Sequence, residues 1–178
     1  MNSTKTILIA DACVLISLVH IGKSAFLKQL IFSCGFEVVV PSVVLNEVEE
    51  EISETQLLSL GVRIFASTKT IAKAIEKERR ELKFSSLALS DQDIECLFIA
   101  LHENGILWTN DKNLKKSAEL CGVCVYRLMR PLIIMQERGL LLREDLLDIA
   151  KQIEANEKWL PRGWLALIEE ELNKQERR

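Results

Sequence analysis

Short apolar runs that alternate with segments of helical periodicity constrain the fold of this chain more than any other feature. The apolar runs lie at residues 7–11, 36–40, 61–65, 106–109 and 123–126. Between them, apolar residues recur at helical spacing, for example Ile94, Leu97, Phe98 and Leu101. Strands separated by helical crossovers form a parallel sheet with helices on both faces. The sequence therefore predicts an α/β fold with three layers, α/β/α, and a parallel sheet of about five strands.

The pattern changes after residue 130, where the strand signal ends. Apolar residues recur there at helical spacing, as in 140–149 and 165–172. We therefore predict one domain over residues 1–130 and a helical C-terminal appendage over 131–178, packed on that domain or on a partner. Within the first part, an amphipathic charged helix is expected over residues 71–83.

The composition narrows the class of protein. With 178 residues, of which 48% are hydrophobic and 28% charged, the chain is long enough to bury a proper core. No apolar stretch reaches the roughly 20 residues that span a bilayer, and Asp11 interrupts the first apolar run, so neither a membrane span nor a signal peptide is expected. The five cysteines are then interpreted as reduced thiols, and the predicted location is the cytoplasm.

The formal net charge of −3 counts modestly against a nucleic-acid binder, because such proteins are often basic overall. The objection weakens if the acids concentrate in a metal pocket while basic residues lie around it. Lys112, Lys115 and Arg127 lie beside predicted strand ends and are candidates for phosphate contacts.

Four carboxylates stand at the ends of apolar segments or just beyond them: Asp11, Glu47, Asp93 and Asp111. The strand ends of a parallel sheet share one edge, so acids far apart in sequence can meet there. Several carboxylates together cannot all stay ionised without a compensating cation. Oxygen ligands suit Mg²⁺ or Mn²⁺, which can activate a water molecule and shield a phosphodiester. The pattern predicts a divalent-metal site.

Each acid also has a local explanation. Asp11 and Asp111 could cap the helices that follow them, and Asp93 could close a capping box with Ser90. Glu47 lies in an acidic run that could be a solvated surface. The joint placement of the four acids favours the metal site over these separate explanations.

Four motifs, in this order, carry a family resemblance: Ile-Ala-Asp11-Ala-Cys-Val-Leu-Ile-Ser-Leu, Val-Pro-Ser-Val-Val-Leu-Asn-Glu47-Val, Leu89-Ser90-Asp-Gln-Asp93-Ile-Glu-Cys-Leu-Phe-Ile-Ala and Leu-Trp-Thr109-Asn110-Asp111. The chain resembles the PIN-domain family of metal-dependent ribonucleases, which includes toxins of the VapC type, and its appendage is similar to that of the DUF3368 subgroup. The resemblance implies that Asp11, Glu47, Asp93 and Asp111 hold Mg²⁺ or Mn²⁺. Thr109 matches the hydroxyl residue that precedes the last acid by two places, and the resemblance implies that it supports the geometry of the site.

Two positions depart from the family pattern. Cys13 stands where Ser, Thr or Asn is usual, and a thiol is a weaker hydrogen bonder than a hydroxyl. Gln92-Asp93 replaces the Gly-Glu of the nearer subgroup, with Asp91 and Glu95 as spare acids nearby.

The leading hypothesis is a divalent-metal-dependent endoribonuclease that hydrolyses RNA phosphodiester bonds, as the toxin of a toxin–antitoxin pair. A catalytically weak or inactive PIN-like module that binds RNA or protein is the first alternative. An enzyme with Asp11 as a phosphatase nucleophile is disfavoured, because the second acid that such chemistry places two residues later is absent. An antitoxin and a second copy of the chain are the expected protein partners. Trp159 and Trp164 in the appendage could serve such an interface or pack within the chain.

Overall fold

The structure is a computed structural model, and it describes residues 5–66, 73–74, 76–77, 89–157, 160 and 163–175. The helix expected over residues 71–83 falls mostly outside these residues, and Trp159 falls outside them as well.

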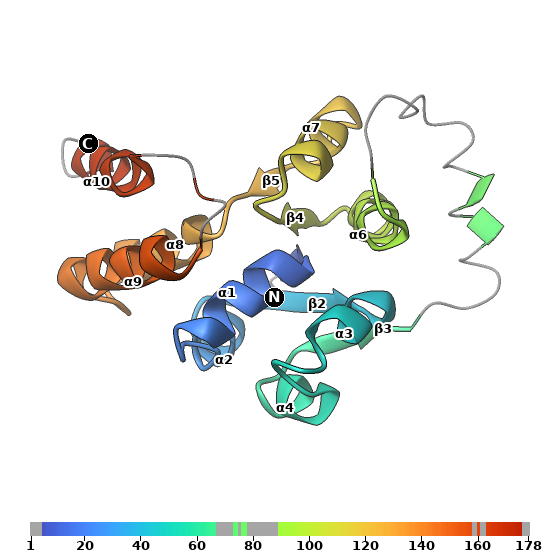
Figure 1. Cartoon of the computed structure of the whole chain (residues 1–178), viewed down its shortest axis with the longest axis horizontal. Coiled ribbons are helices and arrows are strands. Elements are labelled where there is room, and N and C mark those ends of the chain that lie inside the picture. The colour runs from blue at the N-terminus through green and yellow to red at the C-terminus, as the bar shows by residue number, and fades with distance from the viewer. Residues whose placement is uncertain are drawn as a thin grey trace.

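The described strands form one parallel sheet in the order β3-β2-β1-β4-β5 (Figure 1). Their bounds are β1 Thr6–Ala10, β2 Phe36–Pro41, β3 Arg63–Phe65, β4 Ile106–Trp108 and β5 Val125–Tyr126. Each strand coincides with one of the five apolar runs, which confirms the predicted parallel sheet. The central strand β1 pairs through Ile9 with Val39 on one side and Leu107 on the other.

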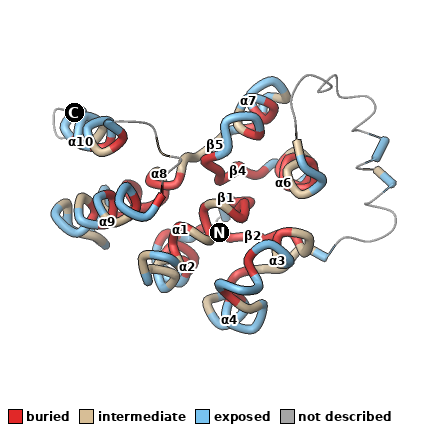
Figure 2. The backbone as a smooth tube through the Cα atoms, viewed as in Figure 1, coloured by how far each residue is buried: buried red, intermediate tan, exposed pale blue. Residues whose placement is uncertain are grey.

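Helices cover both faces of this sheet. Strand β1 is followed by α1 Ala12–His20 and α2 Phe26–Phe32, and β2 is followed by α3 Ser42–Val48 and α4 Glu54–Ser59. Helix α6 Asp91–His102 lies between β3 and β4, and α7 Lys112–Leu120 lies between β4 and β5. Helices α1 to α4 lie on one side of the sheet, and α6 and α7 lie on the other (Figure 1). The three-layer prediction is therefore confirmed. Figure 2 shows the strands buried in the middle and the outward helix faces exposed.

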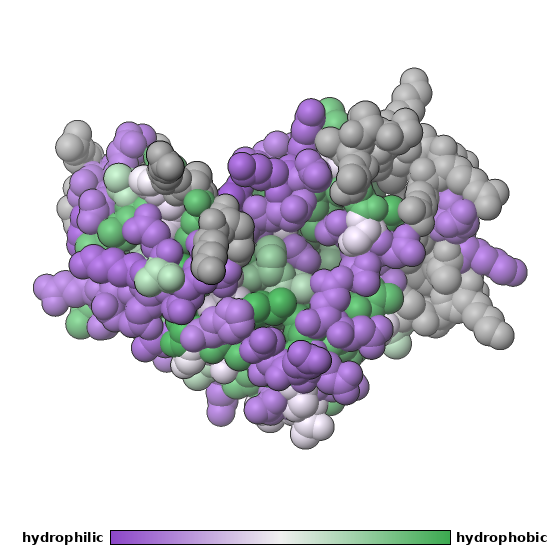
Figure 3. Space-filling model, viewed as in Figure 1, coloured by the Kyte–Doolittle hydropathy of each residue, from purple (hydrophilic) through white to green (hydrophobic). Residues whose placement is uncertain are grey.

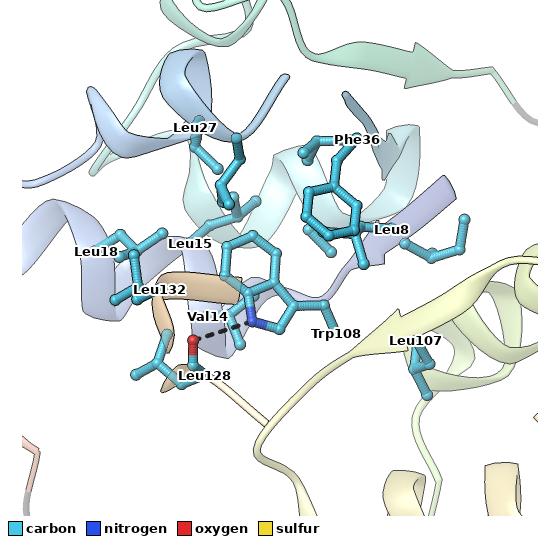
Figure 4. Close-up of a cluster of buried hydrophobic side chains, with 14 of the residues drawn as sticks. Leu8, Val14, Leu15, Leu18, Leu27, Phe36, Leu107, Trp108, Leu128 and Leu132 are labelled. Atoms are coloured by element: carbon cyan, nitrogen blue, oxygen red, sulfur yellow. Dashed lines mark hydrogen bonds between the residues drawn. The ribbon is translucent and has the colours of Figure 1, made fainter. Parts of the chain in front are cut away.

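Trp108 is the largest fully buried side chain among the residues that the structure describes. It lies on the α1 side of β4, beside Val14 and Leu15, whereas Leu107 points to the opposite side (Figure 4). Successive residues of a strand face opposite sides of a sheet, so one strand supplies both layers of core. The indole Nε1–H donates to the carbonyl oxygen of Leu128 at 3.3 Å, which ties the end of β4 to the segment after β5.

Three helices follow the sheet: α8 Met129–Glu137, α9 Arg143–Asn156 and α10 Trp164–Gln175. Helix α8 packs on β5, and α9 packs on α1, α8 and α10. The boundary near residue 130 stays a prediction from the sequence pattern. Trp164 is only 7% exposed, which agrees with packing of this aromatic within the chain.

A polar contact also joins α9 to α1. Ser17 Oγ lies 2.8 Å from Glu157 Oε1, at the end of α9, and 2.8 Å from the carbonyl oxygen of Cys13. His20 Nδ1 lies 3.7 Å from the same Glu157 oxygen, and His20 Nε2 lies 3.4 Å from Glu51 Oε1. Ser17 and Glu157 are both buried, so this contact belongs to the helix interface.

All five cysteines are free thiols. None of the helices in the described ranges combines the length and the apolar character that a bilayer crossing requires.

Candidate metal centre

The four predicted acids come from four different elements near the edge of the sheet where the parallel strands end. Asp11 directly follows β1, and its backbone N–H donates to the carbonyl oxygen of Trp108 at 3.1 Å. Asp111 follows β4, whereas Glu47 lies in α3 and Asp93 in the first turn of α6.

Asp11 occupies the position that caps α1, but its side chain makes no capping hydrogen bond. Its carboxylate is buried, and Oδ2 instead accepts hydrogen bonds from Thr109 Oγ1 at 2.7 Å and from Cys13 Sγ at 3.0 Å. The capping explanation for Asp11 is therefore wrong. Two donors from different parts of the chain fix the orientation of this carboxylate.

Thr109 links the first acid to the last. Its side chain is completely buried, and its hydroxyl donates to Asp11 while accepting a hydrogen bond from the backbone N–H of Asp111 at 3.0 Å. A hydroxyl is both donor and acceptor, so one side chain can satisfy both contacts. Thr109 thus joins the Asp11 carboxylate to the backbone of Asp111.

Cys13 contacts Asp11 although it is a thiol where a hydroxyl is usual. Burial raises the pKa of the Cys13 thiol well above its ordinary value, and the neighbouring Asp11 charge raises it further. The thiol therefore keeps its proton at neutral pH and donates it to Asp11. The sulfur also accepts a hydrogen bond from the backbone N–H of Asn110 at 3.3 Å.

Asp93 combines a local role with a place beside the other acids. It closes a capping box with Ser90: Asp93 Oδ2 accepts from the Ser90 backbone N–H at 2.8 Å, and Ser90 Oγ accepts from the Asp93 backbone N–H at 3.0 Å. Burial raises the pKa of Asp93, the bonds with Ser90 oppose that rise, and the charges of Asp11 and Asp111 add to it. The capping explanation for Asp93 is therefore correct, and its place in a metal site stays a prediction.

Glu47 is exposed on α3 and responds to the same group of charges. Partial burial raises its pKa, and the charges of Asp11 and Asp93 raise it further. Asp93, rather than the spare acids Asp91 and Glu95, is the residue of α6 whose charge acts on Glu47. Glu47 therefore lies close enough to Asp11 and Asp93 for their charges to act on its carboxyl.

Asp111 caps α7, because its Oδ1 accepts a hydrogen bond from the backbone N–H of Leu114 at 2.7 Å. The predicted capping role of Asp111 is therefore confirmed, as it is for Asp93. The cap uses only Oδ1 of Asp111, so Oδ2 is not part of it. In the described part of the chain, each of the four acids keeps at least one oxygen without a hydrogen-bond partner.

The donor set fits a hydrated hard cation better than a fully enclosed one. Among the residues that the structure describes, no three His, Cys, Asp or Glu side chains gather closely enough to surround an ion as they stand. Mg²⁺ usually keeps several waters and uses only one or two protein carboxylates directly. Free carboxylate oxygens that repel one another are suited to that mode of binding.

The comparison with known families decides what kind of domain this is. A family model described as DUF3368, a PIN domain, matches residues 7–174. The chain belongs to the PIN-domain family. No curated protein matches the sequence of this PIN domain.

Solved structures that are similar to this PIN domain have low sequence identity to it. A PilT N-terminus domain protein from the archaeon Sulfolobus solfataricus P2 is 15% identical over 72% of this chain and 92% of its own, with a TM-score of 0.52. VapBC2 from Rickettsia felis, bound to a DNA fragment from the promoter, is 16% identical, covering 68% of this chain and 98% of its own, with a TM-score of 0.49. VapBC-1 from nontypeable Haemophilus influenzae is 14% identical, with 70% and 100% covered and a TM-score of 0.49.

A cavity of about 470 Å³ adjoins Asp111, one of the four acids of this PIN domain. Its lining is Cys13, Asn110, Asp111, Lys112 and Asn113. The sequence interpretation gave Asn110 no role of its own. Its position between Thr109 and Asp111, directly after an apolar strand, was the signal that could have singled it out.

The three basic residues predicted beside the strand ends have different surroundings. Lys112 is exposed and lines the cavity. Lys115 pairs with Glu119 on the same helix at 3.5 Å. Arg127 is half-buried, and its Nε donates to Asn110 Oδ1 at 3.0 Å. Of the three, only Lys112 lines the cavity.

Proposed function

We propose that this PIN domain is a divalent-metal-dependent endoribonuclease that hydrolyses phosphodiester bonds of RNA. The observation that carries the proposal is the placement of four carboxylates from separate parts of the chain near one edge of the sheet. Burial raises the pKa values of Glu47 and Asp93, and the charges of neighbouring acids of this set add to the rise. Membership in a family whose proteins are generally nucleases supports it independently.

In this proposal Asp11, Glu47, Asp93 and Asp111 hold Mg²⁺ or Mn²⁺ directly or through water. The chemistry supplied by such an ion is activation of a water molecule and shielding of the charge on the scissile phosphate. Thr109 acts as a positioning residue.

The contribution of the chain itself is orientation. The bonds from Thr109 and Cys13 both end on Oδ2 of Asp11, so Oδ1 is left over in a fixed direction. The hydrogen bond from the backbone N–H of Asp111 to Thr109 holds the last acid at a fixed position relative to Asp11. A fixed carboxylate needs little reorganisation when charge develops at the phosphate.

We further propose that the protein acts in the cytoplasm as the toxin of a toxin–antitoxin pair, with an antitoxin and a second copy of the chain as partners. The resemblance of its motifs and appendage to VapC-type and DUF3368-type proteins supports this.

Cleavage of single-stranded RNA in the presence of Mn²⁺ tests the proposed activity. Asp11→Asn should lower the rate by about 100-fold or more, since it removes an oriented charge from the site. Asp148→Asn is the matched control, because Asp148 is an exposed acid on α9. The assignment fails if wild type and Asp11→Asn cut equally poorly while both stay folded.

The alternative of a catalytically weak binding module has two observations in its favour, the thiol at Cys13 and the open spacing of the acids. Isothermal calorimetry with Mn²⁺ separates the two. An enzyme of the proposed kind binds Mn²⁺ and loses that binding on Asp93→Asn, whereas a metal-independent scaffold shows no heat of binding in either form.

A further inference from the structure

We propose that Asn110 is a positioning residue for the metal site. Its buried side chain ties the loop between β4 and α7 to the start of α8, and its backbone thereby holds the Cys13 thiol on the Asp11 carboxylate. The inference rests on the proposed metal-dependent function and deepens it, because it gives the site a support that lies outside the four acids and Thr109.

The Oδ1 atom of Asn110 accepts two hydrogen bonds from the segment that leads into α8. Arg127 Nε and the backbone N–H of Leu128 both donate to it at 3.0 Å. The carbonyl oxygen of Leu128 accepts in turn from Trp108 Nε1 at 3.3 Å. Both backbone polar groups of Leu128 are therefore bonded to residues at the end of β4 or just after it, so the loop and this segment are joined at two points.

The nitrogen end of the same amide has no such partner. Asn110 is only 4% exposed, and its Nδ2 is the one buried side-chain nitrogen or oxygen in the described ranges without a hydrogen-bond partner. An unpaired buried donor destabilises a folded protein. The amide cannot turn over to relieve this without losing both bonds to Oδ1. Asn110 thus tolerates a buried, unpaired nitrogen in order to keep its oxygen in place, and the buried amide is out of reach of a substrate.

The backbone of Asn110 acts on the first acid through Cys13. Its N–H donates to Cys13 Sγ at 3.3 Å, and Sγ donates to Asp11 Oδ2 at 3.0 Å. A thiol has one proton, so an N–H donor on the sulfur leaves that proton for the carboxylate. Because a thiol is a weak hydrogen bonder, its bond to Asp11 depends on how closely the sulfur is held. A displacement of the backbone at residue 110 would therefore loosen the support of Asp11.

Helix α7 gives the loop little apolar packing of its own. Its buried residues are Leu114, Ser117 and Ala118, of which Leu114 alone has a large apolar side chain. Hydrophilic side chains cover α7 on the face seen in Figure 3. The two bonds to Asn110 Oδ1 are therefore a large part of what fixes the loop in place.

Isothermal calorimetry with Mn²⁺ on the full chain tests this role. Asn110→Ala removes both bonds to Oδ1 and should weaken Mn²⁺ binding by about 3- to 10-fold. Mutating a residue that bonds a metal ligand directly typically weakens metal binding by about 10- to 100-fold, and Asn110 acts one bond further away. The substitution changes no charge, so the repulsion among the acids stays the same.

Trp108→Phe is the matched control for a merely structural effect. It releases the carbonyl oxygen of the same Leu128 and should destabilise the protein, but it leaves both bonds to Asn110 Oδ1 in place. This variant should bind Mn²⁺ as the wild type does. Urea denaturation ranks the two variants by stability, so a loss of affinity is not mistaken for a loss of fold.

A double-mutant cycle shows whether Asn110 acts through Cys13. If it does, adding Asn110→Ala to Cys13→Ala should weaken Mn²⁺ binding little further, because the thiol that it holds is already gone. Independent effects on binding would multiply instead. Multiplied losses overturn the proposal.

Hydrogen exchange of the backbone amide at residue 110, followed by NMR in EDTA, gives a readout without metal. After correction for the intrinsic rate of each residue type, this amide should exchange faster in Asn110→Ala than in Trp108→Phe. Equal exchange in the two variants overturns the proposal, because the side chain would then not hold the N–H on the Cys13 sulfur.

Equal Mn²⁺ affinity of Asn110→Ala and the wild type also overturns the positioning role. A wild type that binds no Mn²⁺ overturns it together with the proposed metal site. The two failures are distinguishable, because the first is seen only in the comparison of variants and the second is seen in the wild type itself.

Discussion

Replacing Thr109 by valine removes one hydroxyl and almost no volume, and it should destabilise the protein measurably. Valine has nearly the same shape as threonine, so the completely buried site is neither emptied nor overfilled. The variant loses the bond donated to Asp11 at 2.7 Å and the bond accepted from the Asp111 N–H at 3.0 Å.

The magnitude follows from the kind of each bond. A hydrogen bond to a charged group contributes about 1.5–3 kcal/mol, and a neutral one about 0.5–1.5 kcal/mol. Cys13 still donates to the same Asp11 oxygen, which offsets part of the first loss. We therefore expect Thr109→Val to lower the free energy of unfolding by about 2–3 kcal/mol.

Thr109→Ser is the matched control, because it keeps the hydroxyl and loses only a buried methyl group. That loss should cost about 1 kcal/mol. Urea denaturation at pH 7 compares the two variants. With a urea m-value of about 2 kcal/mol per molar, the valine variant should unfold roughly 0.5–1 M earlier than the serine variant.

The reasoning is refuted if the valine variant is as stable as the serine variant or more stable. Such a result would mean that the hydroxyl does not hold the Asp11 carboxylate in the folded protein. Unequal m-values would make the midpoints incomparable, so the slopes are compared first.

The remaining predictions concern the thiol, the exposed acid and the buried indole. Cys13→Ser should increase Mn²⁺ affinity in calorimetry, because a hydroxyl is a stronger donor to Asp11 than a thiol; weaker affinity would contradict this. Glu47→Gln should raise the free energy of unfolding at pH 7 by roughly 0.3–0.5 kcal/mol. The raised pKa means that the folded protein holds this proton more tightly than the unfolded chain does, so Glu47 destabilises as pH rises through its folded pKa. The urea midpoints of the wild type and of Glu47→Gln should therefore converge at about pH 3, where Glu47 is protonated in both the folded and the unfolded state. Trp108→Phe should cost about 2 kcal/mol in urea denaturation, through lost ring volume and the bond to Leu128, and a cost below about 0.5 kcal/mol would argue against a tightly packed core there.

The order of strands and helices could be predicted because local patterns determine it. The run from Ile7 to Ala10 is apolar at every position, as a strand buried on both faces requires, and it ends at the charge of Asp11. Gly35 was predicted to end a helix, and in the structure it lies just after α2 with a φ of +67°, a conformation that glycine adopts readily. The position of β1 between β2 and β4 is a tertiary property that no local pattern specifies.

The candidate site was predictable as a set of acids but not as a network. Local patterns suggested capping for Asp11, Asp93 and Asp111 alike, and only the second and third cap a helix with their side chains. Asp11 differs from the other two because its carboxylate bonds to Thr109, 98 positions away in sequence, and not to the backbone of the following helix. Sequence spacing alone cannot rank a local partner against a distant one.

Cys13 shows the same limit at a single position. Cys13 departs from the family pattern, and a thiol is a weaker hydrogen bonder than the usual hydroxyl. The thiol nevertheless donates to that carboxylate, because the fold encloses it beside Asp11 and keeps it protonated. The effect of having Cys rather than Ser at position 13 thus depends on how the fold buries the side chain, which cannot be read from the residue type.

Ser17 has a single hydroxyl proton and two oxygens at equal reach, the carbonyl of Cys13 and the carboxylate of Glu157. A single proton can donate a well-aligned hydrogen bond to only one of these two oxygens at a time. The first oxygen belongs to the helical turn that follows Asp11, and the second belongs to the far end of α9. Truncating the chain before residue 157 would give that proton to the backbone alone. Shortening the protein more than a hundred residues downstream would thus change a polar contact of its first helix.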